Sequence, residues 1–194
     1  MNKKEAVRSL IATTKDPLKI IIGSGGIEYE GWVATNKDVL DILSDTDWIY
    51  LFEGRLIDCV LAEHVWEHIV PSQQFQAAKM CFQHLKRGGI LRVAVPDGYR
   101  TDPRYQEEVL PPKDGHTMIF TYRTLQDLFE QADFQVRLLE YFDEYGKFHI
   151  QDWNPQQGMI RRSLRFDNQE DFEIYADGNR IKYTSIIIDA VKPE

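Results

Sequence analysis

The stretch that decides the fold is KIIIGSGGIEYEGWVATN, which runs from Lys19 to Asn36. Two short apolar runs, 20–22 and 32–34, lie on either side of a turn. That turn contains Gly23, Gly25, Gly26 and Gly31. An apolar, β-branched run followed by closely spaced glycines is typical of a buried strand that ends in a loop whose backbone approaches a ligand. A plain glycine turn between two paired strands is the alternative, and it would explain only one or two of these glycines.

The composition predicts a globular protein with a substantial buried core. Of its 194 residues, 43% are hydrophobic and 28% are charged, which fits a single domain over 1–194 with an insert and hairpin region at 142–182. The net charge of −8 leaves no broad electropositive surface for nucleic acid or anionic lipid. We therefore expect a small-molecule partner, no nucleic acid, no membrane, and a monomer or homodimer.

Cysteine usage and the N-terminus bear on the compartment. The two cysteines, Cys59 and Cys81, lie inside apolar segments, which suits buried free thiols in a reducing environment. The N-terminal residues include basic side chains but no long apolar core, and no stretch approaches the ~18 apolar residues of a membrane span. These features predict a cytoplasmic protein.

The periodicity predicts alternating helices and strands. A first helix is expected over 3–14. A second is expected to begin at Ser72 as its N-cap and to end at Gly88 as its C-cap, with Lys86 and Arg87 in its last turn. A third is expected to begin after Thr121 as its N-cap and to end at 132. Strands are expected over 19–22, 32–36, 39–43, 56–62, 90–95 and 134–141. Loops are expected around Asp45, Asp47 and Gly54 and over 98–120, where such length is typical of a lid or a binding wall.

The alternation predicts a mostly parallel sheet, and the tail predicts an antiparallel addition to it. The segment 172–175 and the β-branched segment 180–191 are separated by an Asp-Gly turn and are typical of a hairpin. We expect this hairpin to form an antiparallel edge.

Taken together, KIIIGSGG, GWVATN, LIDCVLAEHVWEH and HLKRGGILRVAVPD resemble the class I S-adenosylmethionine-dependent methyltransferases, specifically a small bacterial group whose glycine loop leads directly into a Gly-Trp strand. The resemblance covers residues 19 to about 141. It implies an α/β fold with a doubly wound, mostly parallel, seven-stranded Rossmann-like sheet whose last strand is antiparallel. It also implies S-adenosylmethionine (SAM) as the cofactor.

The resemblance assigns cofactor-binding residues one by one. Gly23 and Gly25 would let the backbone approach the methionine and ribose portions. Asn36 stands where such enzymes carry a carboxylate for the ribose hydroxyls, and it offers a weaker, uncharged acceptor. The remaining positions implied are Asp41 near the adenine amino group, Ile42 as an apolar wall, and Glu63 and His64 beyond the fourth predicted strand.

We expect the methyl acceptor to be a small molecule or a sugar-like hydroxyl, and if it is a hydroxyl a general base would be useful. His116 in the long loop, Asp97 after the strand at 90–95, and His149 in the insert are candidates for that base. Each also has a structural explanation: Asp97 can cap a turn, His116 can be a solvated loop residue, and His149 can pack beside Phe148.

Three other functions stay open at this stage. His64-Val-Trp-Glu67-His68 spells an inverted zinc-hydrolase signature with two histidines one helical turn apart, although the site is expected to hold no metal. A nicotinamide dinucleotide enzyme would need a helix after the glycines, and the few residues between Gly26 and the second strand leave no room for one. A methyltransferase-like domain that serves as a non-catalytic binding or interaction module is the third.

Overall fold

The computed structural model describes residues 2–165, 173–174, 180–181 and 184–194. Its helices are α1 (Lys3–Thr13), α2 (Asp45–Phe52), α3 (Pro71–His84), α4 (Pro103–Val109) and α5 (Tyr122–Gln131), with 3-10 turns η1 (Trp66–His68), η2 (Lys113–Gly115) and η3 (Pro155–Gln157). Its strands are β1 (Lys19–Ile21), β2 (Val33–Ala34), β3 (Ile57–Glu63), β4 (Leu85–Pro96), β5 (Gln135–Phe142), β6 (Phe148–Ile150), β7 (Glu173–Ile174), β8 (Arg180–Ile181) and β9 (Ser185–Val191).

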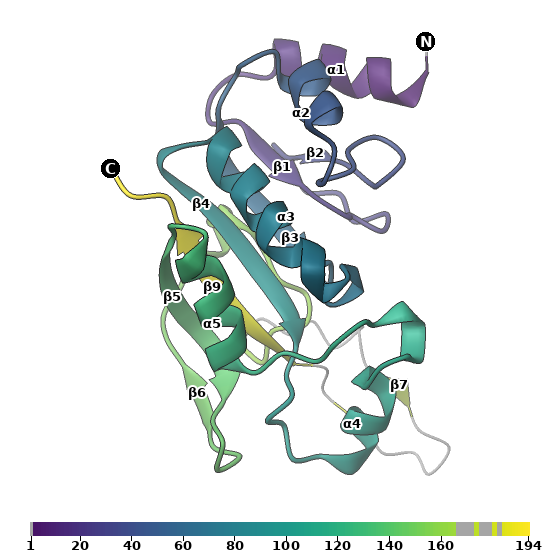
Figure 1. Cartoon of the computed structure of the whole chain (residues 1–194), viewed down its shortest axis with the longest axis vertical. Coiled ribbons are helices and arrows are strands. Elements are labelled where there is room, and N and C mark those ends of the chain that lie inside the picture. Colours follow the sequence, from purple (N-terminus) through teal and green to yellow (C-terminus); the bar gives the residue numbers. More distant parts are fainter. Residues whose placement is uncertain (1, 166–172, 175–179, 182–183) are drawn as a thin grey trace.

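A seven-stranded sheet of order β2-β1-β3-β4-β9-β5-β6 forms the centre of the fold (Figure 1). Strand β1 pairs in parallel with β2 and β3, and β3 pairs in parallel with β4. Strand β9 is antiparallel to both β4 and β5, and β6 is antiparallel to β5. The predicted Rossmann-like, mostly parallel sheet with an antiparallel last strand is therefore confirmed.

The position predicted for the last strand was wrong in one respect. Strand β9 lies between β4 and β5, and the short strand β6 forms the edge. Residues 186–188 of β9 are three isoleucines, all fully buried, and such a strand needs neighbours on both sides. The predicted hairpin pairs β7 with β8 in a separate two-stranded sheet, and its Asp-Gly turn lies outside the described residues.

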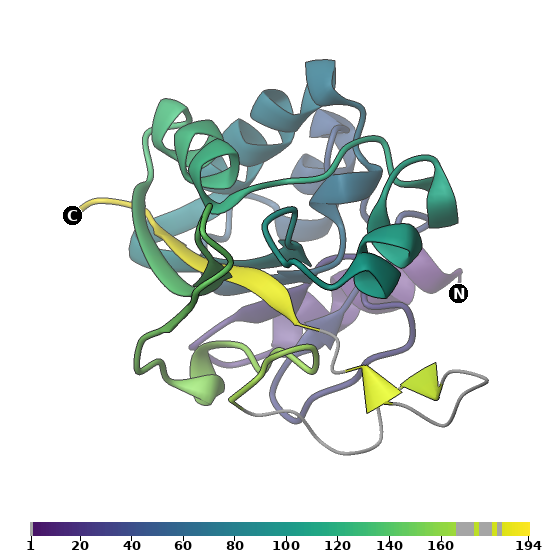
Figure 2. The same cartoon turned by 90° about the horizontal axis from the view of Figure 1, so that it is seen from below.

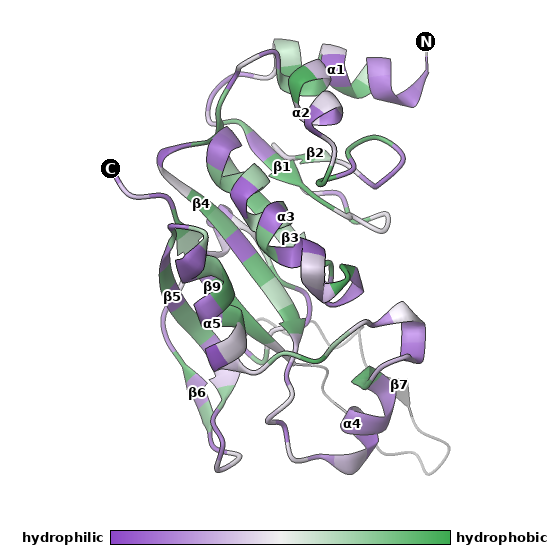
Figure 3. Ribbon diagram, viewed as in Figure 1, coloured by the Kyte–Doolittle hydropathy of each residue, from purple (hydrophilic) through white to green (hydrophobic). Residues whose placement is uncertain are grey.

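The two faces of the sheet are covered differently. Buried residues of α1, α2, α3 and α5 join a large apolar cluster with one face of the strands. The opposite face packs a smaller cluster to which the segment after β6, which contains η3, contributes Trp153 and Ile160. Figure 2, seen from below, shows helices gathered on one side of the sheet, and Figure 3 colours β9 mostly as hydrophobic and α4 mostly as hydrophilic.

The segment 39–52 departs from the prediction. Residues 39–43 form turns and no strand, because the carbonyl of Asn36 accepts from the N–H groups of Val39 and Leu40 and the Asp41 carboxylate accepts from the N–H of Leu43. The expected loop that follows is instead α2, capped by Ser44 and anchored by buried apolar side chains. These are Trp48, Leu51 and Phe52.

The ends of α3 were also predicted wrongly. Its N-cap is Val70, Pro71 occupies the first turn, and Ser72 lies within the helix. The helix ends at His84, and Lys86, Arg87 and Gly88 belong to β4. Gly88 has a φ of +70° and donates its N–H to the carbonyl of Lys192, so it serves the pairing with the C-terminal segment rather than a helix cap.

Two helix predictions and the buried cysteines are confirmed, and the segment predicted as a long loop differs. Helix α1 and the Thr121 cap of α5 are confirmed, and Cys59 and Cys81 are buried free thiols. The segment 98–120 is not a continuous loop, because it contains α4 and η2. Within the described residues, no helix combines the length and the apolar character needed to cross a bilayer.

Candidate functional site

Two adjoining cavities open at the carboxyl ends of the parallel strands, where ligands bind in open α/β sheets. Their volumes are about 360 and 320 Å³, and Gly23, His64 and His68 line both. The first cavity is further lined by Ile22, Lys37, Leu40, Asp41, Ile42, Leu43, Val65, Ile69, Val70 and Gln73. The second is further lined by Ser24, Gly25, Ile27, Glu63, Pro96, Asp114, His116, Arg161 and Arg162.

Gly23 and Gly25 of the glycine loop lie in different surroundings. Gly23 has a φ of +62°, which favours glycine. A β-carbon there would also lie 2.7 Å from Cγ2 of Val65, so contacts within the protein, and not a ligand, account for glycine at this position. Gly25 has a φ of +56° and faces open space, with no atom within 4 Å of an added β-carbon. Gly25 therefore borders room that a ligand can occupy.

Asn36 does not line either cavity. Its exposed side chain accepts a hydrogen bond from the backbone N–H of Gly25 at 2.9 Å. The structure thus places Asn36 as a brace for the glycine loop, and contact with a ribose remains a prediction.

Asp41 and Ile42 both line the first cavity, close to Gly23. Lys37 lies 3.9 Å from the Asp41 carboxylate, and the backbone N–H of Asp41 donates to Asp47 of α2. Helix α2, which was not predicted from the sequence, therefore holds Asp41 at the cavity wall.

Glu63 lies at the end of β3 and is almost fully buried on the second cavity. Its carboxylate accepts the backbone N–H groups of Arg161 and Arg162 at 3.2 and 3.0 Å. Glu63 therefore anchors the segment that brings these two arginines to the cavity, and its predicted cofactor contact stays untested.

His64 follows β3 in a left-handed conformation, with a φ of +55° that a non-glycine residue rarely adopts. Its Nε2 lies 2.9 Å from Oγ of Ser185 in β9, and its Nδ1 lies 2.8 Å from Oε1 of the buried Glu67. Burial by itself raises the pKa of Glu67, but the neighbouring His64 and His68 outweigh it and leave that pKa below the ordinary value.

The segment from His64 to His68 does not form the helix that the zinc-hydrolase signature requires. Only Trp66–His68 form a 3-10 turn, so the two histidines do not lie one α-helical turn apart. The carbonyl oxygens of Trp66 and Ile69 accept from the side chain of Gln74 in α3, which fixes this turn against the helix. The motif therefore lacks its structural context.

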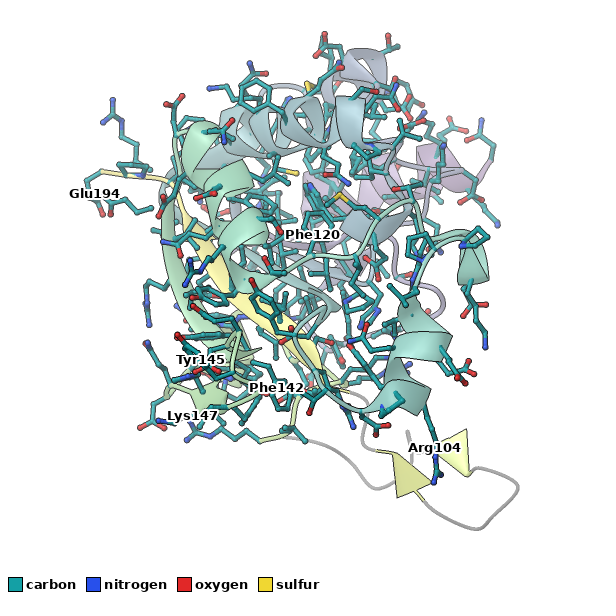
Figure 4. All side chains as sticks on the ribbon, turned by 60° about the horizontal axis from the view of Figure 1, so that its bottom comes forward. Arg104, Phe120, Phe142, Tyr145, Lys147 and Glu194 are labelled. Carbon is teal, nitrogen blue, oxygen red and sulfur yellow. The ribbon has the colours of Figure 1, made fainter. Side chains whose placement is uncertain are left out.

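The three candidate bases lie in different places. Of the three, only His116 lines a cavity. Asp97 is fully buried and accepts backbone N–H groups from Tyr99 and Phe142, and its burial raises its pKa to about 6. His149 lies on the edge strand β6, where its Nε2 is 2.7 Å from the Asp143 carboxylate and its ring stacks on Tyr141. Figure 4 shows Tyr145 and Lys147, in the turn before β6, well apart from Arg104 of α4.

Some residues at the site could not be found from local patterns. Arg161 and Arg162 were not among the predicted site residues, and nothing in the sequence links them to Glu63 almost one hundred residues earlier. Ser185 belongs to a strand whose β-branched pattern predicts burial but not a histidine partner. Residues 22–32 contain no helix, as predicted, so the glycine loop lacks the helix N-terminus that a dinucleotide pyrophosphate needs.

Several solved structures share this fold. A SAM-dependent methyltransferase from Archaeoglobus fulgidus aligns over 98% of this chain and 92% of its own, with a TM-score of 0.52 and 18% identity. A SAM-dependent methyltransferase from Thermotoga maritima aligns over 96% and 87%, with a TM-score of 0.51 and 14% identity. A chain from the complex of the Haloferax volcanii Trm112 methyltransferase activator with a methyltransferase aligns over 98% and 88%, with a TM-score of 0.53 and 11% identity.

No family model matches the sequence, and no curated protein matches it. At these identities the likeness shows the fold alone. The chain has the fold of the class I SAM-dependent methyltransferases.

Proposed function

We propose that this chain is a SAM-dependent methyltransferase that acts on a small-molecule or sugar-like acceptor. The observation that carries the proposal is the cavity pair at the carboxyl ends of the strands, joined at Gly23 and bordered by the open space next to Gly25. Ligands of Rossmann-like folds bind in this region, and a bare backbone permits close approach.

The residues of the first cavity suit the adenosine portion of the cofactor. Ile42 and Leu40 provide apolar walls, and Asp41 provides a carboxylate that can accept from an amino or hydroxyl group. Gly25 and Gly23 then lead toward the second cavity, where the methionine portion would lie. The hydrogen bond from Gly25 to Asn36 fixes the tip of this loop.

SAM supplies an electrophilic methyl group on a sulfonium. The chain therefore has to hold the acceptor in line and keep water away, with little covalent help. The second cavity carries polar and charged residues from two distant segments, which suits a hydroxyl-rich acceptor better than an apolar one. These residues are Asp114, His116, Arg161 and Arg162.

His116 is the side chain best placed to act on an acceptor hydroxyl. Its Nδ1 lies 2.7 Å from the carbonyl oxygen of Val109, and because a carbonyl only accepts, Nδ1 carries the proton. The lone pair of Nε2 is then available to take a proton or to bind a cation.

The proposal is tested by calorimetric titration of the full chain with SAM and with S-adenosylhomocysteine. We expect one saturable site that Gly25→Val abolishes. Gly26→Val is the matched control, because Gly26 also has a positive φ of +97° and open space around it but does not line either cavity. Absence of binding by the wild type, or equal loss in both variants, would contradict the proposal.

A further inference from the structure

Three side chains with metal-ligating atoms gather beside the second cavity. Glu67 and His68 belong to η1, and His116 follows η2 about fifty residues later. One ligand atom from each lies within 4.8 Å of the others. Metal ligands about 2.1 Å from a shared ion lie at most about 4.2 Å apart, so small side-chain rotations would bring these three together.

Glu67 is the residue that most needs an explanation. Its side chain is fully buried, and neither carboxylate oxygen has a hydrogen bond of good geometry within the described part of the chain. Nδ1 of His64 lies 2.8 Å from Oε1, and within the described residues Oε2 has no hydrogen bond to another side chain. A buried carboxylate is costly unless it is paired or coordinates a metal.

His116 is oriented as a metal-binding histidine is. A ligating imidazole almost always donates its other ring N–H to a carbonyl or carboxylate, which fixes the tautomer. The contact of Nδ1 with Val109 supplies that partner and leaves Nε2 for the ion. His68 is exposed, and its ring lies 5.0 Å from that of His116 at an angle of 70°, so the two rings meet at the cavity edge.

The two ligand-bearing segments are held together independently of any ion. The backbone N–H of Thr117 donates to the carbonyl oxygen of Glu67 at 2.7 Å. Its hydroxyl donates to the carbonyl oxygens of Glu67 and Ile69 at 3.0 and 2.8 Å. Because Thr117 adjoins His116, these bonds fix the loop ligand relative to the η1 ligands before a metal arrives.

We propose that Glu67, His68 and His116 bind a divalent first-row transition-metal ion, with Zn²⁺ as the test ion. Two imidazoles and a carboxylate suit such an ion, and three protein ligands leave a coordination position open. Since His68 and His116 line the second cavity, that position faces it. On the proposed methyltransferase function, an acceptor hydroxyl bound there would lose its proton more readily, and His116 would act as a ligand rather than a base.

The test is calorimetric titration of the chelator-treated full chain with ZnCl2, together with the visible absorption of the Co²⁺ form. We expect one ion per chain, and we expect His68→Ala and His116→Ala each to weaken binding at least about 100-fold, beyond the usual effect of losing an outer-shell partner. His68 is exposed, so His68→Ala is expected to fold normally. His149→Ala is the control, because His149 lies on β6 away from the cavities, and it should bind Zn²⁺ like the wild type.

Absence of a saturable site, or an affinity unchanged in His68→Ala and His116→Ala, would overturn the metal proposal. Gly25→Val separates it from the cofactor proposal, because that variant should lose SAM binding and keep Zn²⁺ binding. SAM binding without Zn²⁺ binding would refute only the metal site. Zn²⁺ binding without SAM binding would refute only the proposed function.

Discussion

The side-chain oxygen of Asn36 accepts a hydrogen bond from the backbone N–H of Gly25 at 2.9 Å, which ties the end of β2 to the tip of the glycine loop. A second bond runs in parallel, from the N–H of Ser24 to the carbonyl oxygen of Thr35. The loop that borders both cavities is therefore fixed to the neighbouring strand by two hydrogen bonds.

This relationship predicts different outcomes for two substitutions of Asn36. Asn36→Asp keeps an oxygen acceptor and should retain cofactor binding. Asn36→Ala removes the acceptor and should lower the free energy of unfolding by about 0.5–1.5 kcal/mol, the usual worth of one hydrogen bond, and weaken SAM binding. Urea unfolding and calorimetry measure the two effects. Equal behaviour of the two variants would show that the brace has no role.

Gly23 should be intolerant of substitution for reasons internal to the protein. Gly23→Ala places a β-carbon 2.7 Å from Val65 and also adopts a φ of +62°, which costs roughly 1–2 kcal/mol for a residue other than glycine. Adding Val65→Ala to Gly23→Ala removes the side chain that the β-carbon would contact. The double variant should therefore regain the stability lost to that contact, but not the stability lost to the positive φ. A double-mutant cycle by urea unfolding measures this coupling, and strict additivity would contradict the steric account.

Asp97 should make stability depend on pH in the acidic range. Burial raises its folded-state pKa from 3.8 to about 6, so the folded chain holds this proton more tightly than the unfolded chain does. The contribution of protonated Asp97 to the free energy of unfolding is fully present below about pH 4 and is lost as the pH rises through 6. Its upper limit is roughly 3 kcal/mol. Urea unfolding at a series of pH values should show this decline in the wild type and a smaller one in Asp97→Asn. An identical decline in both proteins would exclude Asp97 as its source.

The buried pair Arg92–Asp189 should dominate the pairing of β4 with β9. Two hydrogen bonds of 2.7 and 2.9 Å join the side chains, and Arg92 also donates to the carbonyl oxygens of Asn154 and Gly158. Arg92→Met leaves the Asp189 carboxylate buried without its partner and should cost about 3–5 kcal/mol. Thermal unfolding measures the loss, and Arg137→Met, at the neighbouring position on β5, is the milder control.

The sequence alone was sufficient for the parallel strands β1, β2, β3 and β4 and for the glycine loop, because their signals are local. It predicted a strand at 39–43 that does not form, and it did not place β9 between β4 and β5. The run 20–22 followed by Gly23 and Gly25 predicts a buried strand and an open loop, and the structure has both. Helix α2 was missed because its aspartates are typical of a loop, although Ser44 and the spacing of Trp48 and Leu51 fit a capped helix.

The assembly of the site could not be predicted because it depends on distant contacts. Glu63 binds backbone N–H groups of Arg161 and Arg162, and backbone donors leave no mark on a sequence pattern. The meeting of Glu67 with His116 likewise depends on the path of the chain between β4 and α5. The zinc-hydrolase motif, which was only an alternative interpretation, lacks the helix that it requires, because its spacing says nothing of whether a helix forms.

The measurement that tests the central claim most directly is an amide ¹H–¹⁵N titration of the full chain with S-adenosylhomocysteine. We expect saturable shifts at Gly23, Gly25, Asp41 and His64, with little change at His149 on the opposite edge of the sheet. Unchanged spectra at saturating ligand, or shifts confined to residues away from both cavities, would contradict cofactor binding at this site.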